Sequence, residues 1–157
     1  MSPATPPSPL AARAAGIDPR GPRFAAWITS AVLAAVLVTS SGWLLAAQTA
    51  VFLTGAVLGL PKAPYGVVFR RLVRPRLAPP AELEAETPPR FAQGVGAAFG
   101  IAGTASFALG ATGAGLVFTG FALVAALLNA AIGFCLGCEL YLLLARISHP
   151  LAARQAS

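Results

Sequence analysis

Two long tracts without a charged side chain constrain the fold of this chain more than any other feature. The first runs from Phe24 to Leu60 and holds 37 residues, and the second runs from Phe91 to Cys138. As one helix the first tract would reach about 55 Å, nearly twice the apolar thickness of a bilayer. Each tract is therefore expected to fold back as a helical hairpin. With 57% apolar residues, the chain also holds more apolar surface than a soluble fold of 157 residues can bury.

Turn-forming residues mark the middle of each tract. Ser40, Ser41 and Gly42 interrupt the first tract, and small residues at 110–115 interrupt the second. We therefore predict an all-α membrane protein with four transmembrane helices in two hairpins. The spans are predicted at residues 24–40, 43–60, 91–109 and 115–138, and the last helix can continue to residue 147.

The positions of the cationic side chains predict the orientation. All 11 lysine and arginine residues fall before the first span, between spans two and three, or after span four. An even number of spans places these three segments on one side, and the positive-inside rule makes that side cytoplasmic. We therefore expect a multi-pass protein of the bacterial inner (plasma) membrane with both termini in the cytoplasm. Nucleic-acid binding is not expected, because topology explains the basic residues and no nucleic-acid-binding fold signature accompanies them.

The segments outside the spans divide the chain into three parts. Residues 1–22 are rich in proline and alanine, show no apolar periodicity and are predicted to form a disordered cytoplasmic tail. Residues 23–147 form the predicted membrane domain, and residues 148–157 form a second cytoplasmic tail. Glu82, Glu84 and Glu86 lie in a proline-bounded connector and are interpreted as solvated groups rather than metal ligands.

The segment between spans two and three predicts a short amphipathic helix on the inner leaflet. At 100° per residue, one arc of the helix is basic and carries Arg70, Arg71 and Arg74, with Val67 as the exception. The opposite arc is apolar and consists of Tyr65, Val68, Phe69, Leu72 and Val73. The arginines would bind anionic lipid headgroups at about 1 kcal/mol each. The alternative is a loop anchored on the membrane for structural reasons alone.

Cys135, Cys138 and Glu139 are the candidate catalytic residues. If span four is helical here, Cys138 and Glu139 lie three and four residues beyond Cys135, so all three share a face. Arg146 marks the end of the apolar run, which puts the pair about 12 Å below that end in an unbroken helix. A break at one of the neighbouring glycines would bring the pair nearer the surface.

This CxxC spacing leaves two interpretations open. The cysteines can act as small apolar packing residues, or they can form a redox or sulfur-handling dithiol in which Glu139 accepts a proton. On the cytoplasmic side the dithiol is the expected resting form. A closed zinc site is not expected, since two cysteines supply too few ligands and His149 lies beyond the span. No cofactor is assigned, because nucleotide-binding motifs are absent from the sequence.

Other features of the tracts predict helix packing. Gln48 and Asn129 are interpreted as hydrogen-bonding groups between helices, with a substrate contact as the alternative. Small residues recur every four positions in span three and favour close helix approach: Ala92, Gly96, Gly100, Thr104 and Ala108. The sequence PRFA opens both hairpins, at residues 22–25 and 89–92, which is a hint of an internal duplication, with a chance match as the alternative. In such a duplication PxxP at the end of span two would face CxxC.

Four segments carry a resemblance to a known family: PRFA, LGLPKAPYGVVFRRLVRPRLAPPAELE, PPRFAQ and LNAAIGFCLGCELYLLL. With these segments the chain resembles the bacterial membrane proteins grouped as domain of unknown function 4395, over residues 17–147. The resemblance implies thioredoxin-like or sulfurtransferase proteins as partners, beside the lipid bilayer. We therefore hypothesise a membrane partner in thiol redox or sulfur transfer. The alternative is a non-enzymatic scaffold or a subunit of a small-solute permease, with structural cysteines.

Overall fold

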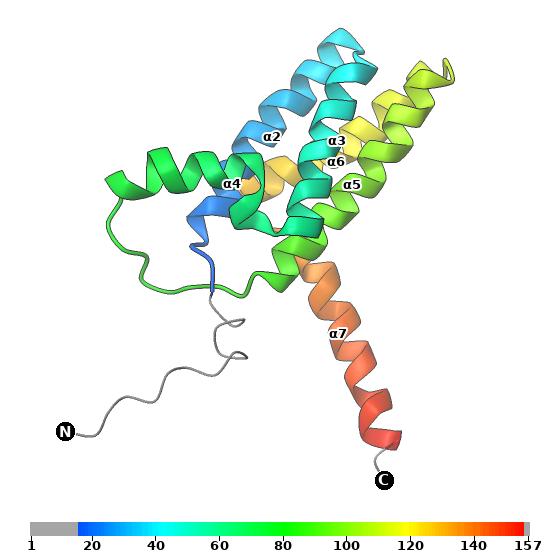
Figure 1. Ribbon diagram of the computed structural model, residues 1–157. Coiled ribbons are helices and arrows are strands. Elements are labelled where there is room, and N and C mark those ends of the chain that lie inside the picture. The colour runs from blue at the N-terminus through cyan, green and yellow to red at the C-terminus, as the bar shows by residue number, and fades with distance from the viewer. Residues whose placement is uncertain (1–15, 156–157) are drawn as a thin grey trace, which may run out of the picture.

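The computed structural model describes residues 16–155 and is helical through most of them (Figure 1). The α-helices are α2 (Arg20–Thr39), α3 (Gly42–Leu58), α4 (Pro64–Val68), α5 (Thr87–Ala108), α6 (Thr112–Ile132) and α7 (Leu136–Gln155). A 3₁₀ turn at Leu60–Lys62 precedes α4, and a π-helical turn at Phe69–Val73 and a 3₁₀ turn at Arg74–Arg76 continue it. The predicted all-α class is therefore confirmed for the described residues.

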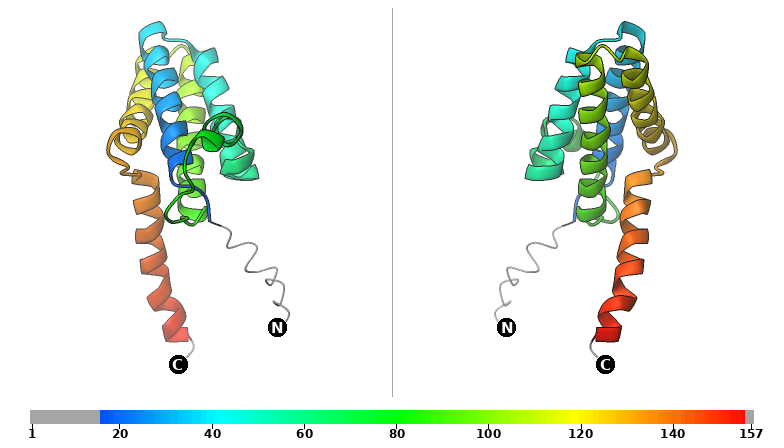
Figure 2. Two further views of the ribbon diagram at one scale, coloured as in Figure 1. Left: turned by 90° about the vertical axis from the view of Figure 1, so that its left-hand side faces the viewer. Right: turned by 90° about the vertical axis from the view of Figure 1, so that its right-hand side faces the viewer.

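Two helical hairpins form a four-helix bundle (Figures 1 and 2). Ser40, with φ 52°, connects α2 to α3, and Gly110, with φ 77°, lies in the turn from α5 to α6. Both turns lie at the same end of the bundle. α2 packs mainly against α6, and α3 packs mainly against α5. The first helix of each hairpin thus faces the second helix of the other hairpin.

The helix boundaries match the predicted spans closely except in the fourth. Predicted spans 24–40, 43–60 and 91–109 correspond to α2, α3 and α5. The fourth helix, α6, ends at Ile132 rather than at residue 138, because Gly133 takes a left-handed conformation with φ 73° that ends it. α7 then begins at Leu136 and continues past residue 147, into the segment predicted as a tail.

Length and composition make α2 and α6 candidate membrane spans. α3 is apolar but has 17 residues. α5 is long enough, yet its first turn carries polar residues and much of the rest is glycine, alanine and threonine, which lowers its mean hydropathy. This criterion therefore supports two of the four predicted spans.

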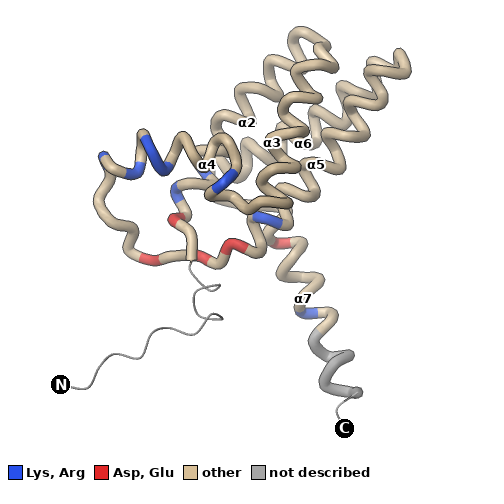
Figure 3. The backbone as a smooth tube through the Cα atoms, in the orientation of Figure 1, with Lys and Arg blue, Asp and Glu red and all other residues tan. Residues whose placement is uncertain are grey.

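Charged side chains gather at one end of the bundle, opposite the two hairpin turns (Figure 3). We call this the charged end; α2 and α5 begin here, and α3 and α6 finish here. α7 projects away from it and carries Arg146 (Figure 2). The hairpin turns carry no charged residue. The bundle is thus strongly polarised along its axis.

The duplicated PRFA sequence has a structural role at the charged end. Arg23 donates hydrogen bonds to the carbonyl oxygens of Ala130 and Ala131, in the last turn of α6, at 3.3 Å each. Arg90 donates to the carbonyl oxygens of Ala56, at 2.7 Å, and Val57, at 2.5 Å, near the end of α3. Helix C-termini leave carbonyl oxygens unpaired and attract cations. Each hairpin therefore caps the second helix of the other, which supports the predicted duplication.

Small residues of α5 let it pack closely on α3, as predicted. An added Cβ atom at Gly96 would lie 3.0 Å from the ring of Phe52, and one at Gly100 would lie 3.1 Å from Cβ of Thr49. At Gly103, outside the predicted stripe, it would lie 2.7 Å from Leu45. Leu45 belongs to the buried core near the hairpin turns, together with Leu33 and Val36. The stripe of small residues is therefore a packing surface.

The helical segment at residues 64–76 lies across the charged end, and its faces differ from the prediction. Tyr65, Phe69 and Val73 turn toward the bundle, and the Phe69 ring packs on Phe24 with a centroid distance of 5.7 Å. Val68 and Leu72 are exposed, although the α-helical wheel placed them on the apolar face. A π turn has more residues per turn than an α-helix, so residues four apart stay on one side of it. Tyr65, Phe69 and Val73 therefore share the side that faces the bundle, and Val68 and Leu72 lie away from it. The basic side is as predicted, and its exposed residues are Arg70, Arg71 and Arg74.

The end of the predicted N-terminal tail belongs to the folded part of the protein. Residues 1–15 of that tail lie outside the described residues. The backbones of Ile17 and Glu84 exchange two hydrogen bonds, at 2.8 Å and 3.0 Å. Arg20 binds the Asp18 carboxylate at 2.8 Å, and this hydrogen bond holds the pKa of Asp18 below its usual range. The segment before α2 is thus fixed to the connector that follows residue 76.

Candidate functional site

The cysteine pair lies at the break between α6 and α7, at the charged end. Gly133 ends α6, and its backbone N–H donates to the carbonyl oxygen of Asn129 at 3.0 Å. Cys135 precedes α7, and Cys138 lies in its first turn. The helix is therefore broken at Gly133, as the neighbouring glycines allowed. The cysteine pair is nearer the end of the bundle than it would be in an unbroken helix.

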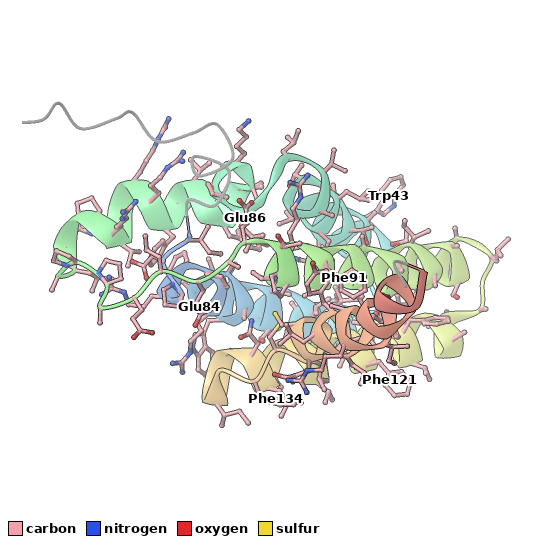
Figure 4. The ribbon with its side chains drawn as sticks, turned by 90° about the horizontal axis from the view of Figure 1, so that it is seen from below. Trp43, Glu84, Glu86, Phe91, Phe121 and Phe134 are labelled. Atoms are coloured by element: carbon pink, nitrogen blue, oxygen red, sulfur yellow. A yellow bond between two sulfur atoms is a disulfide. The ribbon has the colours of Figure 1, made fainter. Side chains whose placement is uncertain are left out.

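Cys135 and Cys138 form a disulfide, with their Cα atoms 5.2 Å apart. Figure 4 shows the molecule from below, with sulfur in yellow where the chain passes into α7. The dithiol as the resting form in the cell stays a prediction. Because Cys135 lies just outside the helix, its side chain can turn back over the first turn and reach Cys138.

The sulfur of Cys135 also receives a backbone hydrogen bond. The N–H of Cys138 donates to Sγ of Cys135 at 3.3 Å. Free N–H groups and the positive end of the helix dipole stabilise a thiolate at this position. This hydrogen bond distinguishes the surroundings of Cys135 from those of Cys138.

The start of α7 is held tightly against α5. An added Cβ atom at Gly137 would lie 2.5 Å from Cβ of Ala92, so only glycine fits there. Four residues further on, the ring of Tyr141 packs on Phe91 with a centroid distance of 5.6 Å. These contacts fix the position of the disulfide relative to the bundle.

Glu139 lies in the first turn of α7 with its side chain exposed. Its backbone N–H donates to the carbonyl oxygen of Cys135 at 3.0 Å. The helix dipole attracts a carboxylate at a helix N-terminus, which favours an acidic residue at this position even when its side chain is exposed. The exposed position of Glu139 is next to the cysteine pair, and its predicted role as a proton acceptor stays a prediction.

A cavity of about 270 Å³ adjoins the disulfide inside the bundle. Cys135, Leu136, Gly137 and Leu140 form its wall on the α7 side. Its other walls come from all four helices of the bundle and are mostly apolar, with three polar residues: Thr29, Gln93 and Asn129. The sequence prediction considered Asn129 but missed Thr29 and Gln93. No periodic signal distinguishes either residue from a packing residue.

A buried hydrogen-bond chain runs from the segment at residues 64–76 to this cavity. Tyr65 donates its hydroxyl to Oε1 of Gln48 at 2.7 Å, and Nε2 of Gln48 donates to Oγ1 of Thr29 at 3.3 Å. Gln48 is 1% exposed. The predicted role of Gln48 in joining helices is therefore confirmed.

The predicted lipid-binding arginines border a second cavity of about 270 Å³, which lies under the segment at residues 64–76. Arg70 and Arg74 line it together with Asp18. Within the described residues no cluster of three or more metal-ligating side chains occurs. The glutamates of the connector differ from one another: Glu82 and Glu84 are exposed, whereas Oε1 of Glu86 accepts the N–H of Leu60 at 2.9 Å.

Comparison with known proteins gives one result. A family described as "domain of unknown function", number 4395, matches residues 17–146. No curated protein and no solved structure matches the chain. The matched region includes both hairpins, the segment at residues 64–76 and the cysteine pair. The chain therefore belongs to the family of domain of unknown function 4395.

Proposed function

We propose that α2, α3, α5 and α6 cross the bacterial inner (plasma) membrane as two hairpins, with the charged end in the cytoplasm. The apolar character of α2 and α6 supports this, and the 17 residues of α3 cover about 26 Å, close to the apolar thickness of a bilayer. Large apolar side chains are exposed around the bundle, including Leu53, Val57, Ile101, Val117, Phe121 and Val124. Such a surface suits lipid and not water.

The test of this arrangement is the accessibility of the charged end. An epitope tag inserted at Pro80, in the exposed connector, is expected to be unreachable from outside intact cells and reachable after permeabilisation. A tag between Gly110 and Ala111, in a hairpin turn, is the matched control. It should be reachable when only the outer membrane is permeabilised and the inner membrane is intact. The opposite pattern would contradict the proposed orientation.

The second part of the proposal is that the protein performs thiol–disulfide exchange through Cys135 and Cys138. The observation that carries it is the disulfide across the first turn of α7, with the Cys138 N–H directed at Sγ of Cys135. This arrangement makes the two sulfur atoms different. Sγ of Cys135 lies just before α7 and accepts the hydrogen bond, and Sγ of Cys138 belongs to a residue within the first turn. Such a difference between the two cysteines allows a mixed disulfide to form on one of them and to be resolved by the other.

The exchange proceeds in two steps that balance. A thiolate of a partner dithiol attacks Sγ of Cys135 and forms a mixed disulfide with it. This step breaks the bond between the two cysteines and releases Cys138, which takes up a proton. The second partner thiolate then attacks the partner sulfur of the mixed disulfide and releases Cys135. The partner gains one disulfide, and the pair gains two electrons and two protons. Glu139 carries the protons between the pair and the surrounding water.

Thioredoxin-like proteins are the proposed partners, since they present a dithiol of this kind. In the sulfur-transfer form of the proposal, reduced Cys135 attacks the outer sulfur of a persulfide on a sulfurtransferase. The sulfurtransferase leaves as a thiolate, and Cys135 keeps the transferred sulfur as a persulfide. Both forms require the same nucleophile, Cys135.

Single-cysteine variants test the proposed roles. In native membranes C138S should trap a mixed disulfide through Cys135, visible as a larger species that disappears on reduction. C135S, the matched control, should trap far less, because the backbone hydrogen bond from Cys138 is directed at Sγ of Cys135 and not at the remaining thiol. Equal trapping by both variants would contradict the assignment of roles. Trapping by neither, together with loss of folding in both, would instead favour the scaffold or permease alternative, with a structural disulfide.

Binding of anionic lipid by Arg70, Arg71 and Arg74 completes the proposal. All three side chains are exposed on the segment that lies across the charged end. Each is expected to contribute about 1 kcal/mol of attraction to an anionic leaflet. In nanodiscs the protein should unfold at a higher temperature with phosphatidylglycerol than with phosphatidylcholine. Replacing the three arginines by glutamine should remove most of that difference, and an unchanged difference would contradict lipid binding there.

A further inference from the structure

The cavity beside the disulfide has the composition of a site for a small apolar ring. Its lining includes three aromatic or large aliphatic side chains that approach from different helices, Phe52, Phe99 and Leu140. Its volume of about 270 Å³ lies just below the range of pockets that hold drug-sized ligands. It therefore suits one ring with short substituents and is too small for a nucleotide or a flavin.

The polar groups of the cavity are amides and a hydroxyl, without a charged side chain among them. Within residues 16–155, no hydrogen bond joins the side-chain amides of Gln93 and Asn129 to other protein groups, and both residues are half-buried. Thr29 is buried and already accepts from Gln48, so its own hydroxyl hydrogen remains available. The three residues thus offer donors to a neutral ligand that carries carbonyl oxygens.

The redox chemistry of the neighbouring pair narrows the choice of ligand. After the proposed exchange the pair is a dithiol, and it must pass two electrons to an acceptor before it can react again. Cys135 lines the cavity, so an acceptor bound there would lie next to the pair. An acceptor that enters an apolar cavity within a membrane-embedded bundle has to dissolve in lipid. A ring with two carbonyl oxygens that accepts two electrons and two protons is a quinone.

We propose that this cavity binds the head group of a membrane quinone, which oxidises the Cys135–Cys138 dithiol. The inference rests on the proposed thiol exchange and names its electron acceptor. In the reaction the two S–H bonds are lost and one S–S bond forms. The quinone receives the two electrons, and each of its two oxygens gains one proton, so that a quinol leaves. Gln93 and Asn129 donate hydrogen bonds to the carbonyl oxygens.

The test uses the full-length protein in nanodiscs, reduced with dithiothreitol and freed of it. Addition of decylubiquinone should restore the disulfide and consume one quinone per protein, measured by the ultraviolet absorbance of the quinone. Oxidised glutathione is the parallel oxidant, which needs no cavity. Oxidation by glutathione but not by decylubiquinone would overturn the quinone site and leave the proposed exchange intact. Oxidation by neither would overturn both proposals.

Cavity variants locate the site. A125F fills the cavity and should slow oxidation by decylubiquinone about tenfold or more. A114F, on the exposed side of the same helix, is the matched control and should keep the wild-type rate. N129L, which removes one donor, should slow the reaction about three- to tenfold. Equal rates in A125F and A114F would overturn the location of the site.

A binding measurement covers the case in which a variant folds poorly. The C135S/C138S double variant cannot react, yet decylubiquinone should raise its unfolding temperature, because a ligand that binds the folded state stabilises it. The same addition to the N129L form of this double variant should give a smaller rise. No rise in the double variant would overturn binding, since Cys135 is one wall residue of the cavity and serine is close to cysteine in size.

Discussion

At the scale of single residues, two glycines decide where the sulfur atoms lie. Gly133 ends α6 in a left-handed conformation, and Gly137 lets the start of α7 touch α5. With any other residue at 137, the helix start must move away from Ala92. The cysteines are thus positioned by neighbours that carry no chemistry of their own.

Replacing Gly137 by alanine tests this dependence. The added Cβ atom would lie 2.5 Å from Cβ of Ala92 and 2.6 Å from its Cα. We expect the unfolding free energy to fall by about 1–3 kcal/mol, as for other overpacked sites, and the mixed disulfide to form more slowly. Thermal unfolding and trapping in the C138S background measure the two effects. G120A is the control: nothing lies within 4 Å of its added atom, so it should fold as well as the wild type.

Tyr65 provides a second test at this scale. Removing its hydroxyl in Y65F leaves Oε1 of the buried Gln48 without its partner, which should cost about 1–3 kcal/mol of unfolding free energy. Y141F is the matched control, since the Tyr141 hydroxyl makes no hydrogen bond to other groups within residues 16–155 and its ring contact with Phe91 is kept. Equal unfolding temperatures for the two variants would contradict the importance of the buried chain.

The sequence identified the CxxC pair and Glu139 but not their surroundings. Whether Gly133 ends a helix depends on how α7 packs against α5, and this packing involves residues far apart in the chain. The same holds for Thr29 and Gln93, which become cavity residues only when the two hairpins come together. Gln48 was predictable because an amide in an apolar tract needs a partner.

At the scale of elements, the two arginine caps join the hairpins. Arg23 binds the end of α6, and Arg90 binds the end of α3. R90Q should lower the unfolding free energy by about 1 kcal/mol, because the carbonyl oxygens of α3 lose a cationic donor. Amide hydrogen exchange should rise in the last turn of α3 and stay unchanged in α2. R146Q is the control, as the Arg146 side chain is exposed and makes no hydrogen bond within the described residues.

The helices themselves were largely predictable from charge and turn residues. The missed features are those in which the local helix geometry departs from the α-helix. The π turn at Phe69–Val73 changes which residues face the bundle, so a wheel drawn at 100° per residue misplaced Val68 and Leu72. The ordering of residues 16–19 was missed as well, since it depends on pairing with Glu84, which lies far along the chain.

At the scale of the whole molecule, the two halves share several structural features but continue differently after their second helix. Each half has a hairpin, an arginine cap and a glycine with positive φ after its second helix, Gly59 or Gly133. After Gly59 the chain continues as PxxP into the basic segment at residues 64–76. After Gly133 it continues as CxxC into α7. We infer that one half anchors the protein to the membrane surface and the other half carries the redox pair.

The redox state of the cysteine pair in native membranes tests the central claim most directly. Membranes are quenched with acid, and free thiols are then alkylated with a reagent that adds mass, before and after mild reduction. A redox-active pair should be oxidised in part, become fully reduced with dithiothreitol, and return to the disulfide when the reductant is removed. A pair that stays fully oxidised under mild reductant, or one that never forms a disulfide, would contradict the account.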